Sequence, residues 1–305
     1  MRLTSFQRLA LATTATTYFL ILVGGLVRAS GAGLGCPDWP RCFGGWIPPV
    51  SLADLPPQFD PALFNPTLMW TEYLNRLLGV TVGFLILATT ISAWRHHRRD
   101  PRILWTTVAA FLLVGFEGWL GGRVVAHGLT PWIVTAHLMV ALVIVQLLLY
   151  ATYAAFKKRA EAIGSDVEVT GGDKPLSLST LALIALTLLQ VGFGTQVRER
   201  IDAARDSGIA RDLALGTVGW LDYLHRDLAF VVLVGAVFLT LWLWSRKSPL
   251  IGWSLVVLAL ALLQVGLGIF MAYGALLPAA QVGHLTLASL MLGAETVLWL
   301  MSRRR

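Results

Sequence analysis

Three histidines lie inside long apolar stretches of the sequence, where an ionisable side chain is costly and marks a functional site by default. They are His137, His225 and His284. Each lies about four to six residues from one end of its stretch, which corresponds to a depth of roughly 6–9 Å in a helix. A single buried histidine can simply bond to a neighbouring carbonyl group, but three at one depth indicate a shared chemical role.

His225 and His284 are predicted to enter a helix bundle from the same side at matching depth. Two imidazoles that face each other across a bundle core suit a six-coordinate haem iron. Structural zinc would need four ligands. Glycine-rich runs at 120–122, 190–194 and 264–268 would offer a smooth helix surface to a flat macrocycle, although glycine is common wherever membrane helices pack. We therefore expect a haem between the two histidines.

The corresponding pair in the first half of the sequence is Asn75 and His137, so one iron ligand is missing there. An open axial position is where substrate exchange or chemistry takes place. Glu72, Asn75 and Arg76 are spaced i, i+3 and i+4 and share one helix face. This spacing predicts a carboxylate and a guanidinium beside His137.

Other charged residues are candidates for supporting roles. Arg28, Arg76, Arg198 and Arg226 would hold haem propionates by bidentate pairing, with interfacial anchoring as the alternative. Glu117 is a candidate proton relay to His137, or a hydrogen-bonded packing residue. Glu295 is expected to reach the inner membrane interface, and no role is assigned to it.

Both cysteines lie in one short proline-containing loop, at Cys36 and Cys42. Two thiols with this spacing can meet the geometry of a disulfide, which persists in an oxidising compartment. Free thiols or a metal clip are the alternatives, although a metal site would want further Cys or His nearby. We expect a structural disulfide, with a redox function as the second interpretation.

The elements that must position these residues are membrane helices. Of the 305 residues 56% are apolar and 13% are charged, and the mean hydropathy is +0.69. These values argue against an ordinary soluble enzyme and exclude a disordered or collagenous chain. About 20 apolar residues span a bilayer. The sequence predicts an all-α membrane protein whose spans lie near 9–28, 70–92, 103–121, 131–155, 176–196, 220–243, 250–272 and 279–301.

The net charge of +7 is a topology signal and predicts no nucleic-acid partner. An even number of spans with both termini in the cytoplasm places 15 of the 24 basic residues on the inner side, as the positive-inside rule requires. We expect a multi-pass protein of the cell membrane, surrounded by lipid. The three histidines would then lie near its outer face.

The two halves of the sequence repeat each other. His137 aligns with His284 without gaps, together with Gly121 and Gly268, and the run 72–76 aligns with 222–226. Both halves then have the same membrane orientation. We expect two pseudo-symmetric four-helix bundles: residues 1–158 as the substrate haem domain, 159–175 as a cytoplasmic linker and 176–305 as the cofactor haem domain.

Several motifs together resemble the haem A synthase family over nearly all eight spans. They are the loop run GAGLGCPDWPRCFG, the motif EYLNR at 72–76 with its repeat DYLHR at 222–226, and the tripeptides TAH at 135–137 and VGH at 282–284. The sequence departs from the family pattern at Asn75, where the motif has a histidine. It also lacks a cysteine pair in 197–220.

The resemblance implies a cofactor haem b between His225 and His284, with the essential glutamate at Glu72. It further implies that the N-terminal half binds haem O, made by a haem O synthase, and oxidises its C8 methyl to a formyl group by successive hydroxylations. The product, haem A, would serve terminal oxidase assembly, and the electron acceptor is unassigned. A b-type cytochrome electron carrier is the alternative function, and a transporter is a weaker one.

Overall fold

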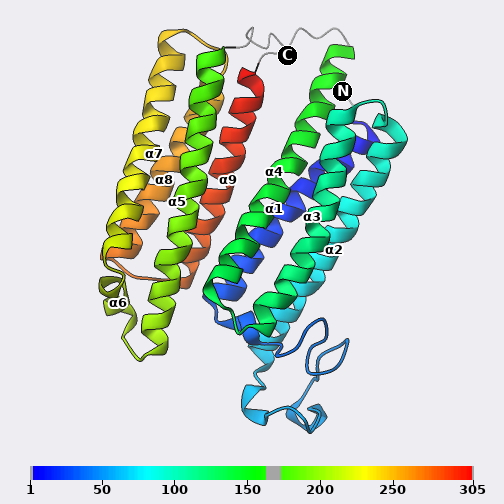
Figure 1. Cartoon of the computed structure of the whole chain (residues 1–305), viewed down its shortest axis with the longest axis vertical. Coiled ribbons are helices and arrows are strands. Elements are labelled where there is room, and N and C mark those ends of the chain that lie inside the picture. Colours follow the sequence, from blue (N-terminus) through cyan, green and yellow to red (C-terminus); the bar gives the residue numbers. More distant parts are fainter. Residues whose placement is uncertain (1–2, 163–172, 304–305) are drawn as a thin grey trace. The chain divides into compact units, whose positions relative to one another are not determined.

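The computed structural model describes residues 3–162 and 173–303. Within these residues eight helices are long and apolar enough to cross a membrane, which confirms the predicted helical membrane fold. The chain divides into two compact units, Met1–Thr152 and Tyr153–Arg305 (Figure 1). Residues 163–172 of the predicted linker lie outside the described residues. The predicted domain boundaries and the pseudo-symmetry of the two halves stay predictions.

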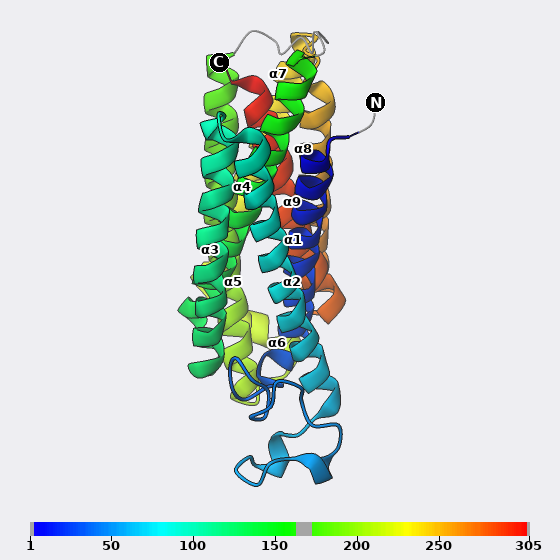
Figure 2. The ribbon, with the colours of Figure 1, turned by 90° about the vertical axis from the view of Figure 1, so that its right-hand side faces the viewer.

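The long helices of the first unit run side by side (Figures 1 and 2). A loop between the first two of them contains three short 3₁₀ helices, η1 (Ala32–Leu34), η2 (Leu52–Asp54) and η3 (Pro61–Leu63). The last long helix continues across the division between the units. The four are α1 (Ser5–Ala29), α2 (Pro66–His97), α3 (Pro101–Ala126) and α4 (Pro131–Ala162).

The second unit contains a closed bundle of four long helices, in which α5 packs against α7 and α9, and α8 also packs against α7 and α9. Two short helices, α6 (Arg211–Ala214) and η4 (Leu215–Thr217), connect α5 to α7. The long helices are α5 (Lys174–Asp206), α7 (Trp220–Ser245), α8 (Ile251–Tyr273) and α9 (Pro278–Ser302).

Three of the long helices begin at an Asn or Asp that stands shortly before a proline. The side chains of Asn65, Asp100 and Asp173 each accept a hydrogen bond from a backbone amide in the first turn of the following helix. These side chains satisfy amides that have no partner within the helix, and proline is tolerated in the first turn because it needs no such partner. Local sequence therefore fixes where α2, α3 and α5 start.

Apolar side chains fill the middle of each bundle, and small hydroxyl groups link neighbouring helices. In the first unit the core includes Val82, Ile86, Ala110, Ile144 and Leu148, from α2, α3 and α4. Direct hydroxyl pairs join Thr13 to Thr89, Thr14 to Thr152, and, in the second unit, Thr240 to Ser254. Short side chains let membrane helices approach closely while these bonds satisfy their polar atoms.

Helix α5 continues about ten residues past the predicted span, through a charged segment. The reason is a second apolar stripe: Val197, Ile201 and Ala204 are spaced i, i+4 and i+7, so they lie on one face. They pack against Val218 and Leu221 at the start of α7. The extension thus builds a small core beyond the membrane stretch and supports the end of α7 that carries His225.

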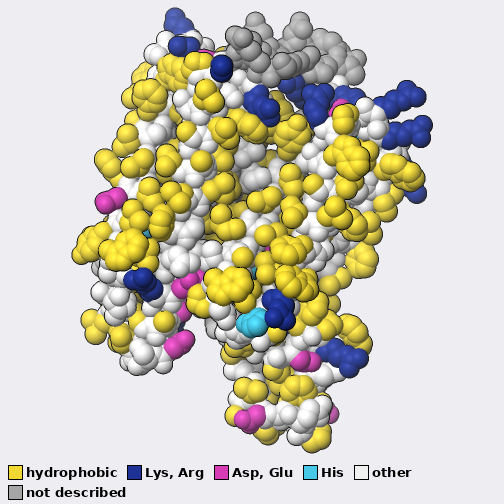
Figure 3. All heavy atoms as spheres, in the orientation of Figure 1, with side chains coloured by type: hydrophobic (Ala, Val, Ile, Leu, Met, Phe, Trp, Pro, Cys, Tyr) yellow, Lys and Arg dark blue, Asp and Glu magenta, His cyan; other side chains and the backbone are white. Residues whose placement is uncertain are grey.

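The lateral surfaces of the helices are apolar, as a lipid environment requires. Exposed large side chains include Phe84, Leu112, Phe230 and Leu263 on four different helices. Figure 3 shows such apolar side chains along the helices, with Lys and Arg gathered toward their ends. In the first unit a basic cluster lies where α2 joins α3, at Arg95, Arg98, Arg99 and Arg102.

Candidate functional site

Two histidines of the second bundle face each other across its interior. His225, on α7, and His284, on α9, have ring centroids 6.4 Å apart, with the ring planes at 62°. Metal–imidazole nitrogen bonds are about 2 Å long, so two of them in line, with the ring radii added, span about 6 Å. The spacing therefore fits a single metal ion held between the two rings, as in a six-coordinate haem.

Glycines on the neighbouring helices leave room for both rings. A Cβ atom at Gly194 of α5 would lie 3.0 Å from Cε1 of His225, and one at Gly268 of α8 would lie 3.5 Å from Cε1 of His284. Hence an added side chain at Gly194 would press against the His225 ring, whereas one at Gly268 would be in ordinary van der Waals contact with the His284 ring. Both glycines belong to runs that the sequence singled out, and the structure gives them this specific packing role.

Among the described residues, each ring has one nitrogen without a standard hydrogen bond, and Nε2 of His225 lies 3.5 Å from Nε2 of Gln190. Nδ1 of His225 and Nδ1 of His284 are buried and make no hydrogen bond of standard geometry within the described residues. The side chain of Gln190, on α5, donates to the backbone carbonyl of His225 at 2.7 Å. Gln190 therefore ties α5 to α7 beside the histidine pair, a contact that the sequence did not predict.

His137 of the first bundle has a carboxylate beside it. Its Nδ1 lies 3.0 Å from Oε1 of Glu117 on α3. One turn further along α3, a Cβ at Gly121 would lie 3.3 Å from Cε1 of His137. The side chain of His137 is 40% exposed and that of Glu117 is 12% exposed. The structure thus brings together two residues that the sequence treated as partners, and a proton relay through Glu117 stays a prediction.

The cysteine loop reaches the same end of α3. A Cβ atom at Gly122 would lie 2.9 Å from the indole of Trp39, which stands between the two cysteines in the sequence. Adjacent glycines of α3 therefore contact His137 and the loop respectively. Trp39 was not among the predicted site residues, although its place inside the Cys-Pro-Asp-Trp-Pro run was the available signal.

The predicted disulfide is confirmed. Cys36 and Cys42 are bonded, with their Cα atoms 4.8 Å apart. Both are buried, and together with Phe43 and Met69 they form a small core at the start of α2. The described residues include no free cysteine. The structural role of the disulfide stays a prediction, with a redox function as its alternative.

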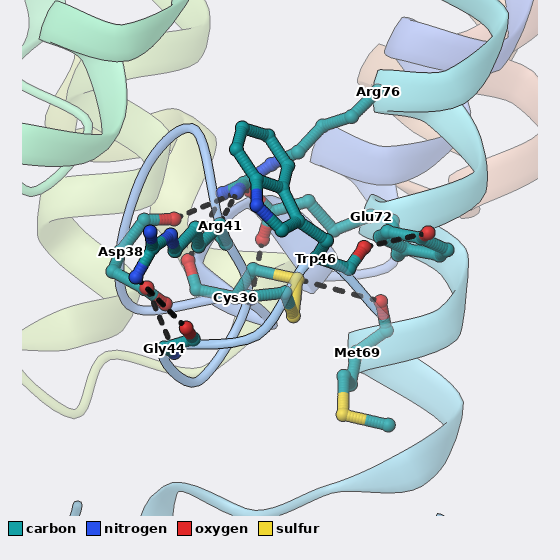
Figure 4. Close-up of a disulfide and its surroundings, with 10 residues drawn as sticks. Cys36, Asp38, Arg41, Gly44, Trp46, Met69, Glu72 and Arg76 are labelled. Atoms are coloured by element: carbon teal, nitrogen blue, oxygen red, sulfur yellow. Dashed lines mark hydrogen bonds and ion pairs between the residues drawn. A yellow bond between two sulfur atoms is a disulfide. The ribbon is translucent and has the colours of Figure 1, made fainter. Parts of the chain in front are cut away.

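Glu72 and Arg76 hold this loop to α2 (Figure 4). Oε2 of Glu72 accepts a hydrogen bond from the amide of Cys36 at 2.7 Å, and Oε1 pairs with Arg76. The guanidinium of Arg76 donates to the backbone carbonyls of Cys36, Asp38 and Arg41, at 3.1, 2.6 and 2.7 Å. Glu72 is only 4% exposed. A role of Glu72 in catalysis and of Arg76 in propionate binding stays a prediction, since both act here on the loop.

The other predicted arginines lie near helix ends. Arg226 pairs with Asp222 one turn before it and donates to the hydroxyl of Tyr273 at 2.9 Å. Arg198 pairs with Asp202 at 2.9 Å. Arg28 lies in the last turn of α1. Their assignment to haem propionates stays a prediction.

The structure corrects the expected position of Glu295 in the second bundle. Glu295 was expected to reach the inner interface, but it is 0% exposed and accepts a hydrogen bond from Thr187 of α5 at 2.9 Å. The expectation was wrong because α9 is the most buried of the long helices, with 67% of the residues in its apolar 18-residue stretch buried. Its side chains therefore meet other helices where a more exposed helix would meet lipid or water.

Fold and site together define a class: a polytopic helical membrane protein whose bundles carry histidines suited to haem iron. Within the described residues no group of three or more His, Cys, Asp or Glu side chains converges on a metal site. The family described as cytochrome oxidase assembly protein (COX15-CtaA) matches residues 7–296. The chain belongs to this family.

Curated relatives are similar over parts of the chain. A protein named "Heme A synthase" from Shewanella oneidensis is 30% identical over 192 residues, which cover 62% of this chain and 54% of that protein. Proteins of the same name from Geobacillus kaustophilus and Allorhizobium ampelinum are 27% and 25% identical, over 50% and 72% of this chain and 44% and 69% of the relative. The chain thus spans about half the length of the first two relatives.

Proposed function

We propose that the protein is a haem A synthase, which oxidises the C8 methyl group of haem O to a formyl group. The observation that carries the proposal is the facing pair of His225 and His284, in a chain that belongs to the cytochrome oxidase assembly protein family. The name of the relatives supports the same activity. Haem A would then be supplied to terminal oxidases.

In this proposal the second bundle holds a cofactor haem b. His225 and His284 would hold its iron, Gly194 and Gly268 leave room for their rings, and Arg198 and Arg226 would bind its propionates. Haem b supplies one-electron transfer when bound. The protein's own contribution is to fix both rings and to keep the bundle interior apolar.

The first bundle is the proposed substrate site for haem O, with His137 as its axial ligand. Asn75 supplies no imidazole on the opposite side, and its buried side-chain oxygen has no hydrogen-bond partner within the described residues. The absence of a second imidazole would leave room for exchange or chemistry at the bound haem. Glu72 would stabilise positive charge that develops as the methyl group is oxidised, since a fixed carboxylate acts strongly where water is excluded.

Coexpression with a haem O synthase tests this function by haem extraction and a pyridine haemochrome spectrum. We expect the wild-type protein to contain haem b together with haem O or haem A. Glu72→Gln keeps an acceptor for the Cys36 amide but removes the charge. It should retain haem b and an intact disulfide while haem A falls by about 100-fold or more.

One control variant and the haem content of the wild type complete the test. His225→Ala should lose haem b, which separates the cofactor site from the substrate site. If the wild-type protein contained haem b alone, an electron carrier would be indicated. If it contained none of these haems, a transporter would be indicated. Undiminished haem A in Glu72→Gln would contradict the catalytic assignment of that residue.

A further inference from the structure

His137 meets α3 through two residues one turn apart. Its Nδ1 lies 3.0 Å from the Glu117 carboxylate, and the edge formed by Cε1 and Nε2 lies 3.3 and 3.9 Å from the position of a Cβ on Gly121. The carboxylate and the glycine therefore fix the rotation of the imidazole about the side-chain bonds of His137. Together they leave Nε2 as the nitrogen for an incoming ligand.

The second bundle repeats the glycine contact, and the residue one turn before the glycine differs. Gly268 of α8 faces Cε1 of His284 at 3.5 Å, and the residue one turn before it is Gln264. The spacing from Gly268 to His284 is the same as that from Gly121 to His137. A carboxylate thus stands in the first bundle where an amide stands in the second.

A carboxylate is the costlier choice at this position. The Glu117 side chain is 12% exposed, and its Oε2 has no hydrogen-bond partner within the described residues. A glutamine of the same shape would avoid the cost of placing a charge in a membrane helix. The partner on which the carboxylate acts is the His137 ring, because that is the polar group the structure places beside it.

We propose that Glu117 is a positioning residue that accepts the Nδ1 hydrogen of His137 and so makes it a stronger electron donor to haem iron than His284. The ring must turn slightly to align its N–H with the carboxylate, since Nδ1 makes no straight hydrogen bond in the structure. A carboxylate behind a ligating histidine fixes its tautomer and raises its basicity. The proposal rests on the proposed function, in which Nε2 of His137 binds the iron of the substrate haem.

Stronger donation by the ligand stabilises the oxidised iron, so the first-site haem should have a lower reduction potential than it would with an amide at position 117. The second site has Gln264 at the corresponding position, which supplies no carboxylate to His284. The two bundles would therefore differ electronically through one residue of α3 and its counterpart on α8. The difference suits one bundle for oxidative chemistry on its haem and the other for holding a cofactor.

A reciprocal exchange tests the proposal on the purified full-length chain, with haem b as the added probe. Glu117→Gln should bind haem at the first site about 10- to 100-fold more weakly, the usual effect of losing such a partner, and should raise the reduction potential of that haem. Gln264→Glu should lower the potential of the second-site haem. Redox titration followed by optical spectroscopy measures both, independently of haem A formation.

His137→Ala separates failure of this proposal from failure of the proposed function. If His137→Ala lost the first-site haem while Glu117→Gln kept the affinity and reduction potential of the wild type, the proposed role of Glu117 would be overturned. The assignment of His137 as iron ligand would be retained. Unchanged first-site haem in His137→Ala would contradict the proposed iron ligand itself. The proposal is supported if Glu117→Gln binds haem more weakly and raises the potential of the first-site haem, while Gln264→Glu lowers the potential of the second-site haem.

Discussion

At the scale of single residues, the side chains with the strongest chemical signal also have structural partners. Arg76 uses its planar fork of donors on three loop carbonyls and on Glu72. A guanidinium suits this task because its N–H groups point in fixed directions, whereas the ammonium of lysine is a single point charge. Glu72 and Arg76 therefore link the disulfide loop to α2, whatever further role they have toward haem.

Arg76→Lys should loosen the loop without removing the positive charge. We expect a loss of about 2 kcal/mol or more in the stability of the loop, because several charge-assisted hydrogen bonds disappear. The rate at which a thiol reductant opens Cys36–Cys42 should rise accordingly. Arg41→Lys is the matched control, since the Arg41 side chain is exposed and contacts Gly44 and Trp46 of the loop itself. Equal rates of reduction for both variants and the wild type would argue that Arg76 does not hold the loop to α2.

At the scale of helices, glycines set the distance between a histidine and the neighbouring helix. The contact recurs three times, at Gly121, Gly194 and Gly268. Other glycines of the same helices, including Gly118 and Gly192, have open space where a Cβ would be. Glycine in a membrane helix therefore has two roles in this chain, and only the position of the neighbouring helix distinguishes them.

Gly194→Ala should displace His225 and weaken haem binding in the second bundle. Overpacking of this kind costs about 1–3 kcal/mol, so haem should dissociate at least about tenfold more readily. Gly252→Ala, near the start of α8 and outside the glycine runs predicted to face haem, has space for its methyl group and should retain haem as the wild type does. The rate of haem transfer to excess apomyoglobin measures both. Similar rates for the two variants would show that the contact with His225 does not limit haem binding.

At the scale of the whole molecule, charge distribution predicts how the chain lies in the membrane. An even number of spans and the basic residues at 95–102, 157–159 and 246–247 predict that these turns and both termini lie in the cytoplasm. The cysteine loop and the histidines would then lie toward the outer face. The location of the disulfide agrees with this orientation, because disulfides persist outside the cytoplasm.

Cysteine labelling tests the orientation, since the native cysteines are bonded to each other. Ser51→Cys, in the loop, and Lys247→Cys, in the turn between α7 and α8, are both at exposed positions. A membrane-impermeant maleimide should label Ser51→Cys in intact cells and Lys247→Cys only in inside-out vesicles. The opposite pattern would reverse the proposed topology, and the wild-type chain serves as the unlabelled control.

The sequence by itself determined the number of membrane helices, most of their starts and the position of each histidine along its helix. These features depend on signals that are local in the chain, such as mean hydropathy and an Asn or Asp before proline. The ends were less predictable: α5 runs on to Asp206 because Val197 and Ile201 find apolar partners on α7. Those partners are set by a fold that hydropathy does not describe.

Only the tertiary structure decided which polar side chains meet. Glu72 bonds to the amide of Cys36, 36 residues away, and Glu295 to Thr187, 108 residues away. Hydropathy places a residue at a depth, but the rotation of each helix about its axis decides whether its side chain meets lipid, a loop or another helix. That rotation is fixed by packing against several helices at once. For this reason the sequence located the three histidines and named Glu117 as a partner of His137, whereas the contact of His137 with Gly121 emerged only from the folded bundle.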